Sequence, residues 1–411
     1  MKKLVILGAG TAGTMMASHL TKKLNKKEWE ITIVDQYKTH YYQPGFLFLP
    51  FGTYKPEDVR KTQDDFIPKG VKLVREKIDK VDKDTDTVLL ESGKKLNYDL
   101  LIIATGSKTA PQETEGLLGD YWYKNIFDFY TFEGSLALRD KLKDWEGGKL
   151  VVHITEMPIK CPVAPLEFAF LADSYFTKKG MRDKVDITYV TPLSGAFTKE
   201  KCSTALAYLL KEKNINIVAD FAVEHVEGEN GKMFDYGGEV VDFDILVTVP
   251  TNMGDEAMAR SGFGNELNFV PTDKHTLQSK IKENIFVIGD ATDVPASKAG
   301  SVAHFQAEIL TENILLYLEG KPLKPDFDGH ANCFIETGFG KALLIDFNYE
   351  HEPVKGKFPF AVVGPLNLLT ESKFNHWGKL AFRWIYWNML LPARKLPFIT
   401  PKMSLAGKQF K

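Results

Sequence analysis

The fold is decided by the stretch LVILGAGTAG at residues 4–13. Residues 4–7 form a continuous apolar run, which is typical of a parallel strand buried on both faces. Gly8, Gly10 and Gly13 follow at the spacing of a dinucleotide-binding loop: they permit a tight turn, close approach of a pyrophosphate, and packing of a helix on the strand. Residues 14–24 are expected to form that helix, whose positive end attracts phosphate. The stretch therefore predicts a Rossmann-like domain.

The next apolar segment ends in a carboxylate. Residues 31–34 predict a second strand, and Asp35 follows it, 22 residues after Gly13. An acid at about this distance accepts hydrogen bonds from the ribose of an adenine dinucleotide. Strand, glycine loop, helix and late acid together indicate a dinucleotide site rather than a glycine turn without a ligand.

The bulk composition limits the class of protein. With 411 residues, 44% hydrophobic and 26% charged, the chain is expected to fold into two or three domains. Its net charge of −2 gives no basic field, so we expect no nucleic-acid partner. Three cysteines are too few for a disulfide scaffold, and we expect no metal site. The short apolar run after Met1 and the lack of a long uncharged stretch predict neither a signal peptide nor a membrane-spanning helix.

Two later segments extend the first domain. Residues 98–106 end in Ala-Thr-Gly and residues 285–291 end in Gly-Asp-Ala, each after an apolar, strand-like run. Both resemble signature segments of the two-dinucleotide-domain flavoproteins, a family that includes glutathione reductase and type II NADH dehydrogenases. The resemblance implies FAD as cofactor, with the Asp290 carboxylate on the ribityl chain of the flavin. The other residues implied to hold FAD here are Thr105, Gly106 and Gly289.

The resemblance also implies the domain plan. We expect an α/β fold with two Rossmann-like dinucleotide-binding domains, the second inserted in the first, plus a C-terminal membrane-associating region. The FAD-binding domain is then discontinuous, over residues 1–109 and 246–320. The second domain covers residues 110–245, and the C-terminal region covers residues 321–411.

The second domain lacks glycine where a nucleotide-binding turn needs it. Residues 155–163 read TEMPIKCPV, between a predicted strand at 149–154 and a predicted helix at 165–178. Side chains in this loop block close approach of a pyrophosphate, so we expect no NAD(P)H site. Cys161 stands in the loop, where the neighbouring Lys160 and the helix N-terminus are expected to stabilise its reactive thiolate.

With these residues, the chain resembles the sulfide:quinone oxidoreductases over essentially its whole length. The resemblance rests on KCPVAP at 160–165, the position of Cys333, PASKAG at 295–300, HFQA at 304–307 and FRWIYWNMLLP at 382–392. It implies that sulfide is oxidised by a redox pair, Cys161 and Cys333, and that electrons pass through FAD to a membrane quinone.

The same resemblance implies roles for further residues. Lys298 would stabilise the anionic reduced flavin near its pyrimidine ring, and Pro44 would lie nearest the isoalloxazine. Many bacterial members carry another cysteine before the position of Cys161; this chain has none there, which indicates a two-cysteine type. Cys202, at the start of a helix predicted at 203–213, is interpreted as structural. Which thiol contacts the flavin, the sulfur chain length and the quinone type stay open.

The C-terminal end differs sharply in charge from the rest of the chain. Residues 372–411, the last 40, contain eight Lys or Arg, no Asp or Glu, and three of the six tryptophans. A helical stripe of apolar residues is predicted from the spacing of Leu380, Trp384, Trp387 and Leu391, bordered by Lys379, Arg383 and Arg394. A basic, tryptophan-rich amphipathic helix favours a membrane interface. We therefore expect residues 366–395 to hold a peripheral, monotopic protein on the cell membrane.

Several alternatives stay open at this stage. The C-terminal helix could instead dock on the protein or form a dimer interface, and a homo-oligomer is possible. A type II NADH:quinone oxidoreductase would share FAD and the membrane helix but would need a pyrophosphate loop in the second domain. A flavocytochrome c-type sulfide dehydrogenase flavin subunit would need export to a haem partner. A persulfide sensor would use the thiols without turnover.

Overall fold

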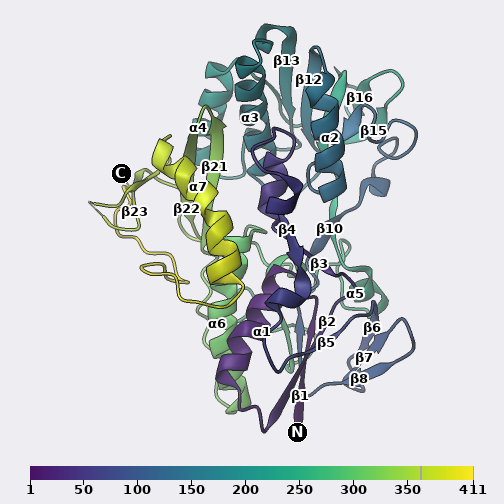
Figure 1. The fold of residues 1–411 in the computed structure, drawn as a ribbon, viewed down its shortest axis with the longest axis vertical. Coiled ribbons are helices and arrows are strands. Elements are labelled where there is room, and N and C mark those ends of the chain that lie inside the picture. The colour runs from purple at the N-terminus through teal and green to yellow at the C-terminus, as the bar shows by residue number, and fades with distance from the viewer. Residues whose placement is uncertain (362, 411) are drawn as a thin grey trace.

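Two five-stranded parallel sheets lie towards opposite ends of the molecule (Figure 1). The computed structural model describes residues 1–361 and 363–410. The first sheet has, in spatial order, β20 (Ile285–Val287), β9 (Leu100–Ile103), β1 (Lys2–Leu7), β2 (Trp29–Val34) and β5 (Lys72–Val74). The second has β11 (Ile126–Phe127), β18 (Ile245–Val249), β12 (Gly148–Ile154), β13 (Val185–Val190) and β14 (Asn216–Val218). The predicted α/β class is confirmed.

Both faces of the first sheet are covered, as the apolar run at its centre requires. In β1, Leu4 and Ile6 join the core that includes α1 (Thr11–Lys23) and α6 (Gly300–Leu318). Val5 and Leu7 point to the other face and join a second core. That face is covered by α5 (Glu256–Arg260) and an antiparallel sheet of β6 (Ile78–Asp82), β7 (Thr87–Leu90) and β8 (Lys95–Asn97).

The second sheet repeats this plan with its own helices. These are α2 (Phe132–Asp144), α3 (Ala164–Lys178) and α4 (Glu200–Glu212). A three-stranded ribbon of β15 (Val223–Glu227), β16 (Lys232–Asp235) and β17 (Val240–Asp242) lies between β14 and β18 in the chain. Since β18 belongs to this sheet, the predicted domain boundary at residue 246 is wrong: the second sheet extends to Val249.

The chain passes between the two sheets twice, and the two passages pair with each other. β10 (Ser107–Thr109) runs antiparallel to β19 (Asn252–Gly254). Another small pair, β3 (Thr39–Tyr41) with β4 (Arg60–Thr62), follows β2. The antiparallel ribbon fixes the position of one sheet relative to the other.

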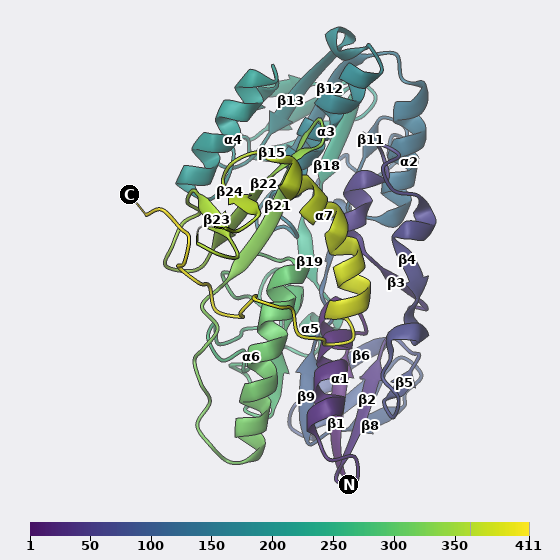
Figure 2. The ribbon, with the colours of Figure 1, turned by 60° about the vertical axis from the view of Figure 1, so that its left-hand side comes forward.

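The C-terminal region lies along the side of both domains (Figure 2). It contains β21 (Ala331–Gly338), β22 (Lys341–Phe347), β23 (Gly356–Phe358), β24 (Leu366–Leu368) and α7 (Lys373–Ile385), which continues into the π-helical turn Tyr386–Leu390. The chain reverses after Gly338, because β21 and β22 form an antiparallel hairpin. Among the helices in residues 1–361 and 363–410, none combines the length and the apolarity that crossing a membrane demands.

Candidate functional site

The predicted dinucleotide loop lies at the carboxyl end of β1, where α1 begins. Gly8 has φ +94°, and a Cβ there would lie 2.5 Å from the Ala104 carbonyl oxygen. A Cβ on Gly13 would overlap the carbonyl of Gly8. At Gly10, by contrast, no described atom lies within 4 Å of an added Cβ. The loop is therefore closed where helix and strand meet and open where a pyrophosphate would approach.

Two polar side chains border this opening. The Asp35 carboxylate accepts hydrogen bonds from the backbone N–H groups of Ala9 (2.6 Å) and Tyr37 (2.8 Å), so it anchors the loop. Each carboxylate oxygen keeps acceptor capacity for a ribose hydroxyl. At the end of β9, the buried Thr105 Oγ1 finds no hydrogen-bond partner among residues 1–361 and 363–410, and Gly106 has φ +70°.

The segment after β20 is held by Lys298. Its Nζ donates to the carbonyls of Asp290 (2.9 Å) and Thr292 (2.7 Å) and lies 3.9 Å from the centre of the Phe269 ring. Burial lowers the pKa of Lys298 to about 8, although Asp290 opposes this shift. Gly289 N–H donates to Gln306 in α6 (2.8 Å). The ammonium thus fixes the Asp290 turn; its contact with a flavin stays a prediction.

The loop of Cys161 is fixed by bonds from three directions. Cys161 N–H donates to the Lys298 carbonyl (2.8 Å), and the Tyr130 hydroxyl donates to the carbonyls of Lys160 (2.7 Å) and Cys161 (3.2 Å). Lys160 N–H donates to Asn252 Oδ1 in β19 (3.0 Å). Cys161 itself has φ +45°, a strained conformation for a residue with a side chain. The backbone N–H and carbonyl groups of residues 160 and 161 are therefore hydrogen-bonded to other parts of the protein.

The structure brings Cys333 to the same place. Cys333 lies on β21, which contacts α3 immediately after the Cys161 loop, and the adjacent Asn332 carbonyl accepts from Ser301 at the start of α6 (2.8 Å). Burial raises the pKa of the Cys161 thiol, and a charge on Cys333 raises it further. All three cysteines are free thiols, with Cys161 and Cys333 partly buried and Cys202 fully buried in α4.

The expected effect of Lys160 on Cys161 is wrong. Lys160 Nζ points to Gln43 Oε1 (3.3 Å) and the Ser107 carbonyl (3.2 Å) instead. This contact places the 3₁₀ turn Gln43–Phe48, which contains Pro44, beside the cysteine loop. The cation that lowers the pKa of Cys161 is Lys379, against the larger raising effects of burial and Glu167.

Lys379 and its partners are the site residues that the sequence analysis missed. Lys379 was predicted to border a membrane stripe, but it is 8% exposed. Its Nζ donates to Glu167 Oε1 in α3 (2.7 Å) and to the Phe334 carbonyl in β21 (3.0 Å). Glu336 N–H also donates to Glu167 Oε1 (2.8 Å), and the Glu336 carboxylate lies 2.9 Å from His376 Nδ1. A lone acid in the apolar run APLEFAFLA, residues 164–172, was the available signal.

Comparison with known proteins gives the family of the chain. Residues 2–307 match the pyridine nucleotide-disulphide oxidoreductases. The chain belongs to this family. It is 29% identical over 399 residues to the mitochondrial sulfide:quinone oxidoreductase of Dictyostelium discoideum, covering 95% of this chain and 86% of that protein. It is 27% identical over 397 residues to the one of Mus musculus, with coverage of 95% and 86%.

A solved structure shares the fold. The X-ray structure of the sulfide:quinone oxidoreductase from Aquifex aeolicus superposes with a TM-score of 0.77 at 24% identity, covering 94% of this chain and 92% of that one. Pyridine nucleotide-disulphide oxidoreductases of this kind bind FAD, and the present residues fit that group. Space is open at Gly10, where α1 begins. Within residues 1–361 and 363–410, neither the Thr105 hydroxyl nor the N-terminus of α1 has a side-chain hydrogen-bond partner.

The exposed face of α7 differs from the stripe that was predicted. Trp387 and Leu391 are buried against the protein, whereas Phe374, Trp377 and Trp384 are 56%, 57% and 61% exposed. The basic residues also dock: Arg383 pairs with Asp58 (2.5 Å) just as Lys379 pairs with Glu167. The helix therefore presents aromatic side chains outward and most of its charge inward.

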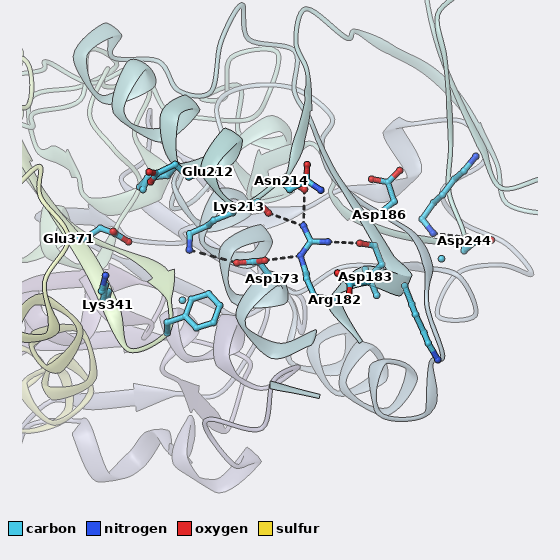
Figure 3. Close-up of a pocket in the computed structure, with 17 residues that line it drawn as sticks. Asp173, Arg182, Asp183, Asp186, Glu212, Lys213, Asn214, Asp244, Lys341 and Glu371 are labelled. Atoms are coloured by element: carbon cyan, nitrogen blue, oxygen red, sulfur yellow. Dashed lines mark hydrogen bonds and ion pairs between the residues drawn. The ribbon is translucent and has the colours of Figure 1, made fainter. Parts of the chain in front are cut away.

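A wide pocket lies at the end of the second sheet where β12 and β13 begin, opposite to the end that carries the Cys161 loop (Figure 3). It has a volume of about 1200 Å³ and is lined by the amino ends of β12 and β13 and the β21–β22 turn. Asp173 at its centre pairs with Arg182 (2.7 Å) and Lys213 (3.7 Å). Ligands of open α/β sheets bind at the carboxyl ends of strands, so this paired cluster is not the dinucleotide site of a pyridine nucleotide-disulphide oxidoreductase.

Proposed function

We propose that this chain is an FAD-dependent sulfide:quinone oxidoreductase, which oxidises sulfide to zero-valent sulfur or polysulfide and passes the electrons to a membrane quinone. The proposal is supported above all by the bond from Cys161 N–H to the Lys298 carbonyl, by the contact between α3 and the strand of Cys333, and by the bond from Lys298 Nζ to the Asp290 carbonyl. Relatives matched over 95% of the chain bear that name.

The two thiols support a balanced reaction. In the resting enzyme Cys161 and Cys333 are joined as a disulfide or through a bridging sulfur. Hydrosulfide attacks one sulfur: the bond between the cysteine sulfurs breaks, a persulfide S–S bond forms on one cysteine, and the other leaves as a thiolate. A second hydrosulfide then attacks the outer sulfur and carries it away as HSS⁻, which returns that cysteine to a thiolate. Re-forming the Cys–Cys bond from the two thiolates gives up two electrons, which bound FAD would accept. Bound FAD supplies two-electron redox chemistry and would be held by Gly8, Gly10, Gly13, Asp35, Thr105, Gly106, Gly289 and Asp290.

Access to a lipid-soluble quinone is the role we assign to α7. Its exposed aromatic residues Phe374, Trp377 and Trp384 are of the kind that inserts at a membrane interface. Lys373 at the start of this segment, and Arg394 and Lys395 at its end, are exposed and would face anionic lipid headgroups. The protein is then peripheral, bound to the cell membrane through residues 366–395.

Anaerobic kinetics with the purified flavoprotein test the proposal. Sulfide should bleach the visible flavin absorption and reduce decylubiquinone, and NADH should do neither. Cys161→Ser and Cys333→Ser should keep FAD but lose sulfide-driven bleaching by at least about a hundredfold, since removing a nucleophile abolishes the covalent step. Bleaching by NADH alone would establish a type II NADH:quinone oxidoreductase instead. Undiminished activity in either cysteine variant would defeat the two-thiol reaction.

A further inference from the structure

A buried ion pair connects the two elements that carry the thiols. Glu167 lies in α3, the helix that follows the Cys161 loop, and accepts a hydrogen bond from Lys379 (2.7 Å). The same ammonium donates to the carbonyl of Phe334, the neighbour of Cys333 on β21 (3.0 Å). Lys379 comes from α7, which packs on β21 and β22. One cation therefore contacts both chain segments of the dithiol site.

Stability alone does not account for this pair. Removing two charges from water costs several kcal/mol per ion, and well-packed apolar residues of the same volume often do as well or better. In addition, Glu167 Oε2 is buried and has no hydrogen-bond partner within the part of the chain that the structure describes. A carboxylate kept buried and half-satisfied indicates a role in the chemistry of its surroundings.

The two charges act on the thiols with opposite sign. Burial raises the pKa of Cys333 to about 12; Lys379 lowers it and Glu167 raises it. The pKa of Cys161 responds in the same two directions. Conversely, burial alone would lower the pKa of Lys379, but Glu167 and a Cys161 thiolate raise it above its usual value. The ammonium is therefore held in its charged form beside the thiols.

We propose that Lys379 is a positioning cation of the dithiol site and that Glu167 balances it. This inference rests on the function proposed above. When the cysteines are joined, the site contains no sulfur anion and Glu167 neutralises the buried ammonium. When hydrosulfide breaks the bond between the cysteines, it brings one negative charge into the site. That charge appears on the cysteine thiolate that leaves, and Lys379 stabilises this thiolate.

Other titratable groups also face the two thiols. Asp346 on β22 and Cys202 on α4 act on Cys333, and Tyr130, before α2, lies near Cys161. Glu336 on β21 acts on Lys379 and is bonded to His376 on α7. Glu336 also joins β21 to α3, but through its backbone N–H, which donates to Glu167 Oε1 (2.8 Å). The charges of all these groups stay in place when Lys379 or Glu167 is exchanged, so the exchanges separate the effect of the pair from this background.

The test measures thiol reactivity rather than turnover. Wild-type and variant proteins, reduced and freed of persulfide, react with iodoacetamide over a pH series, and mass spectrometry reports alkylation of each cysteine. Below the thiol pKa the rate follows the thiolate fraction. Lys379→Met should slow alkylation of Cys161 and Cys333 by about tenfold or more, and Glu167→Gln should accelerate it by a similar factor, since one nearby charge shifts a pKa by about one to three units. Lys379→Arg should restore the wild-type rate.

Opposite directions for the two single variants are the decisive result. Loss of structure would change both in the same direction, and it would also expose Cys202, the buried internal control. If Lys379→Met exposes Cys202, the single variant Glu167→Gln is compared with the double variant Glu167→Gln/Lys379→Met. The double variant removes both charges, so it leaves no unpaired buried charge. Cys161 and Cys333 should then be alkylated more slowly in the double variant than in Glu167→Gln. Equal or unchanged rates in these comparisons overturn the proposal. Alkylation does not depend on sulfide oxidation. If the protein had no sulfide:quinone activity, the proposed function would be wrong, but the alkylation rates would still test the effect of Lys379 and Glu167 on the thiols.

Discussion

At the scale of single residues, the environment of the Cys161 thiol is determined by groups distant in sequence rather than by the residue before it. Lys160 precedes it but points away, toward Gln43 and Ser107. The positive φ of Cys161 turns its backbone so that its N–H meets the Lys298 carbonyl. Such strain persists only where the surroundings fix it, and here Tyr130, Asn252 and Lys298 supply the fixing bonds.

The glycines of the first loop permit a prediction that separates folding from cofactor binding. Gly13→Ala places a methyl group against the Gly8 carbonyl, so it should destabilise the protein by about 1–3 kcal/mol, as overpacking does. Gly10→Ala meets no described atom within 4 Å, so it should leave the melting temperature of the flavin-free protein unchanged. It should nevertheless lower FAD content, because the methyl group occupies the pyrophosphate path.

Flavin absorbance of the purified variants and thermal melts of the flavin-free proteins check this pair. Full FAD content in Gly10→Ala would mean that the loop does not bind a pyrophosphate in the expected way.

At the scale of elements, α7 is both docked and exposed. Four of the basic residues after residue 371 form ion pairs with carboxylates elsewhere in the chain. The pairs are Lys379–Glu167, Arg383–Asp58, Lys402–Asp326 and Lys408–Asp346. The Tyr386 hydroxyl lies 2.6 Å from Thr11 Oγ1, at the start of α1. The helix thus contacts α3 and β21 through Lys379 and the dinucleotide loop through Tyr386, while Phe374, Trp377 and Trp384 stay exposed. Figure 2 shows α7 lying along the outside of the molecule.

Membrane binding by that face is testable on vesicles. Trp377→Ser combined with Trp384→Ser should weaken binding to phosphatidylcholine–phosphatidylglycerol vesicles by at least about tenfold, since burying each large apolar side chain contributes about 1.5–3 kcal/mol. Co-sedimentation measures the effect. Tyr208→Ser on α4 is the matched control, because Tyr208 is as exposed as Trp384, at 61%. Equal binding by the double variant and the control would show that α7 does not mediate membrane binding.

At the scale of the whole molecule, the two sheets and the C-terminal region enclose many buried polar groups. The antiparallel β10–β19 ribbon fixes the sheets relative to each other, and α7 and β21 cover the junction. Buried histidines lie in both domains: His40 in β3 and His304 in α6 of the first, and His153 in β12 of the second. Burial lowers the pKa of His40 and His304 to about 4 and that of His153 to about 3.

These histidines predict acid sensitivity. Each is neutral in the folded protein and binds a proton near pH 6.5 when unfolded. Their full contribution to the free energy of unfolding is present above that pH. It is lost as the pH falls through 6.5 toward about 4, and it amounts to up to about 3 kcal/mol for one fully buried histidine. Urea unfolding over this range should show stability falling with pH, and His153→Phe should flatten the slope. An unchanged slope in that variant would assign acid sensitivity to the carboxylates instead.

The sequence by itself determined the local elements whose cause is local. Residues 4–13 specify strand, loop and helix through apolar pattern and glycine sterics, and the missing glycines of residues 155–163 specify a different kind of loop. The charge shift and tryptophans of the last 40 residues likewise indicated an amphipathic helix.

Only the tertiary structure decided which of these residues meet. Periodicity does not show which side of α7 docks, so Lys379 was assigned to a surface although it is buried against Glu167. Spacing does not place Cys161 beside Cys333, because α3 and β21 come together only when the chain has crossed between the sheets twice. Burial and charge around the thiols are properties of that assembly, since they depend on neighbours distant in sequence.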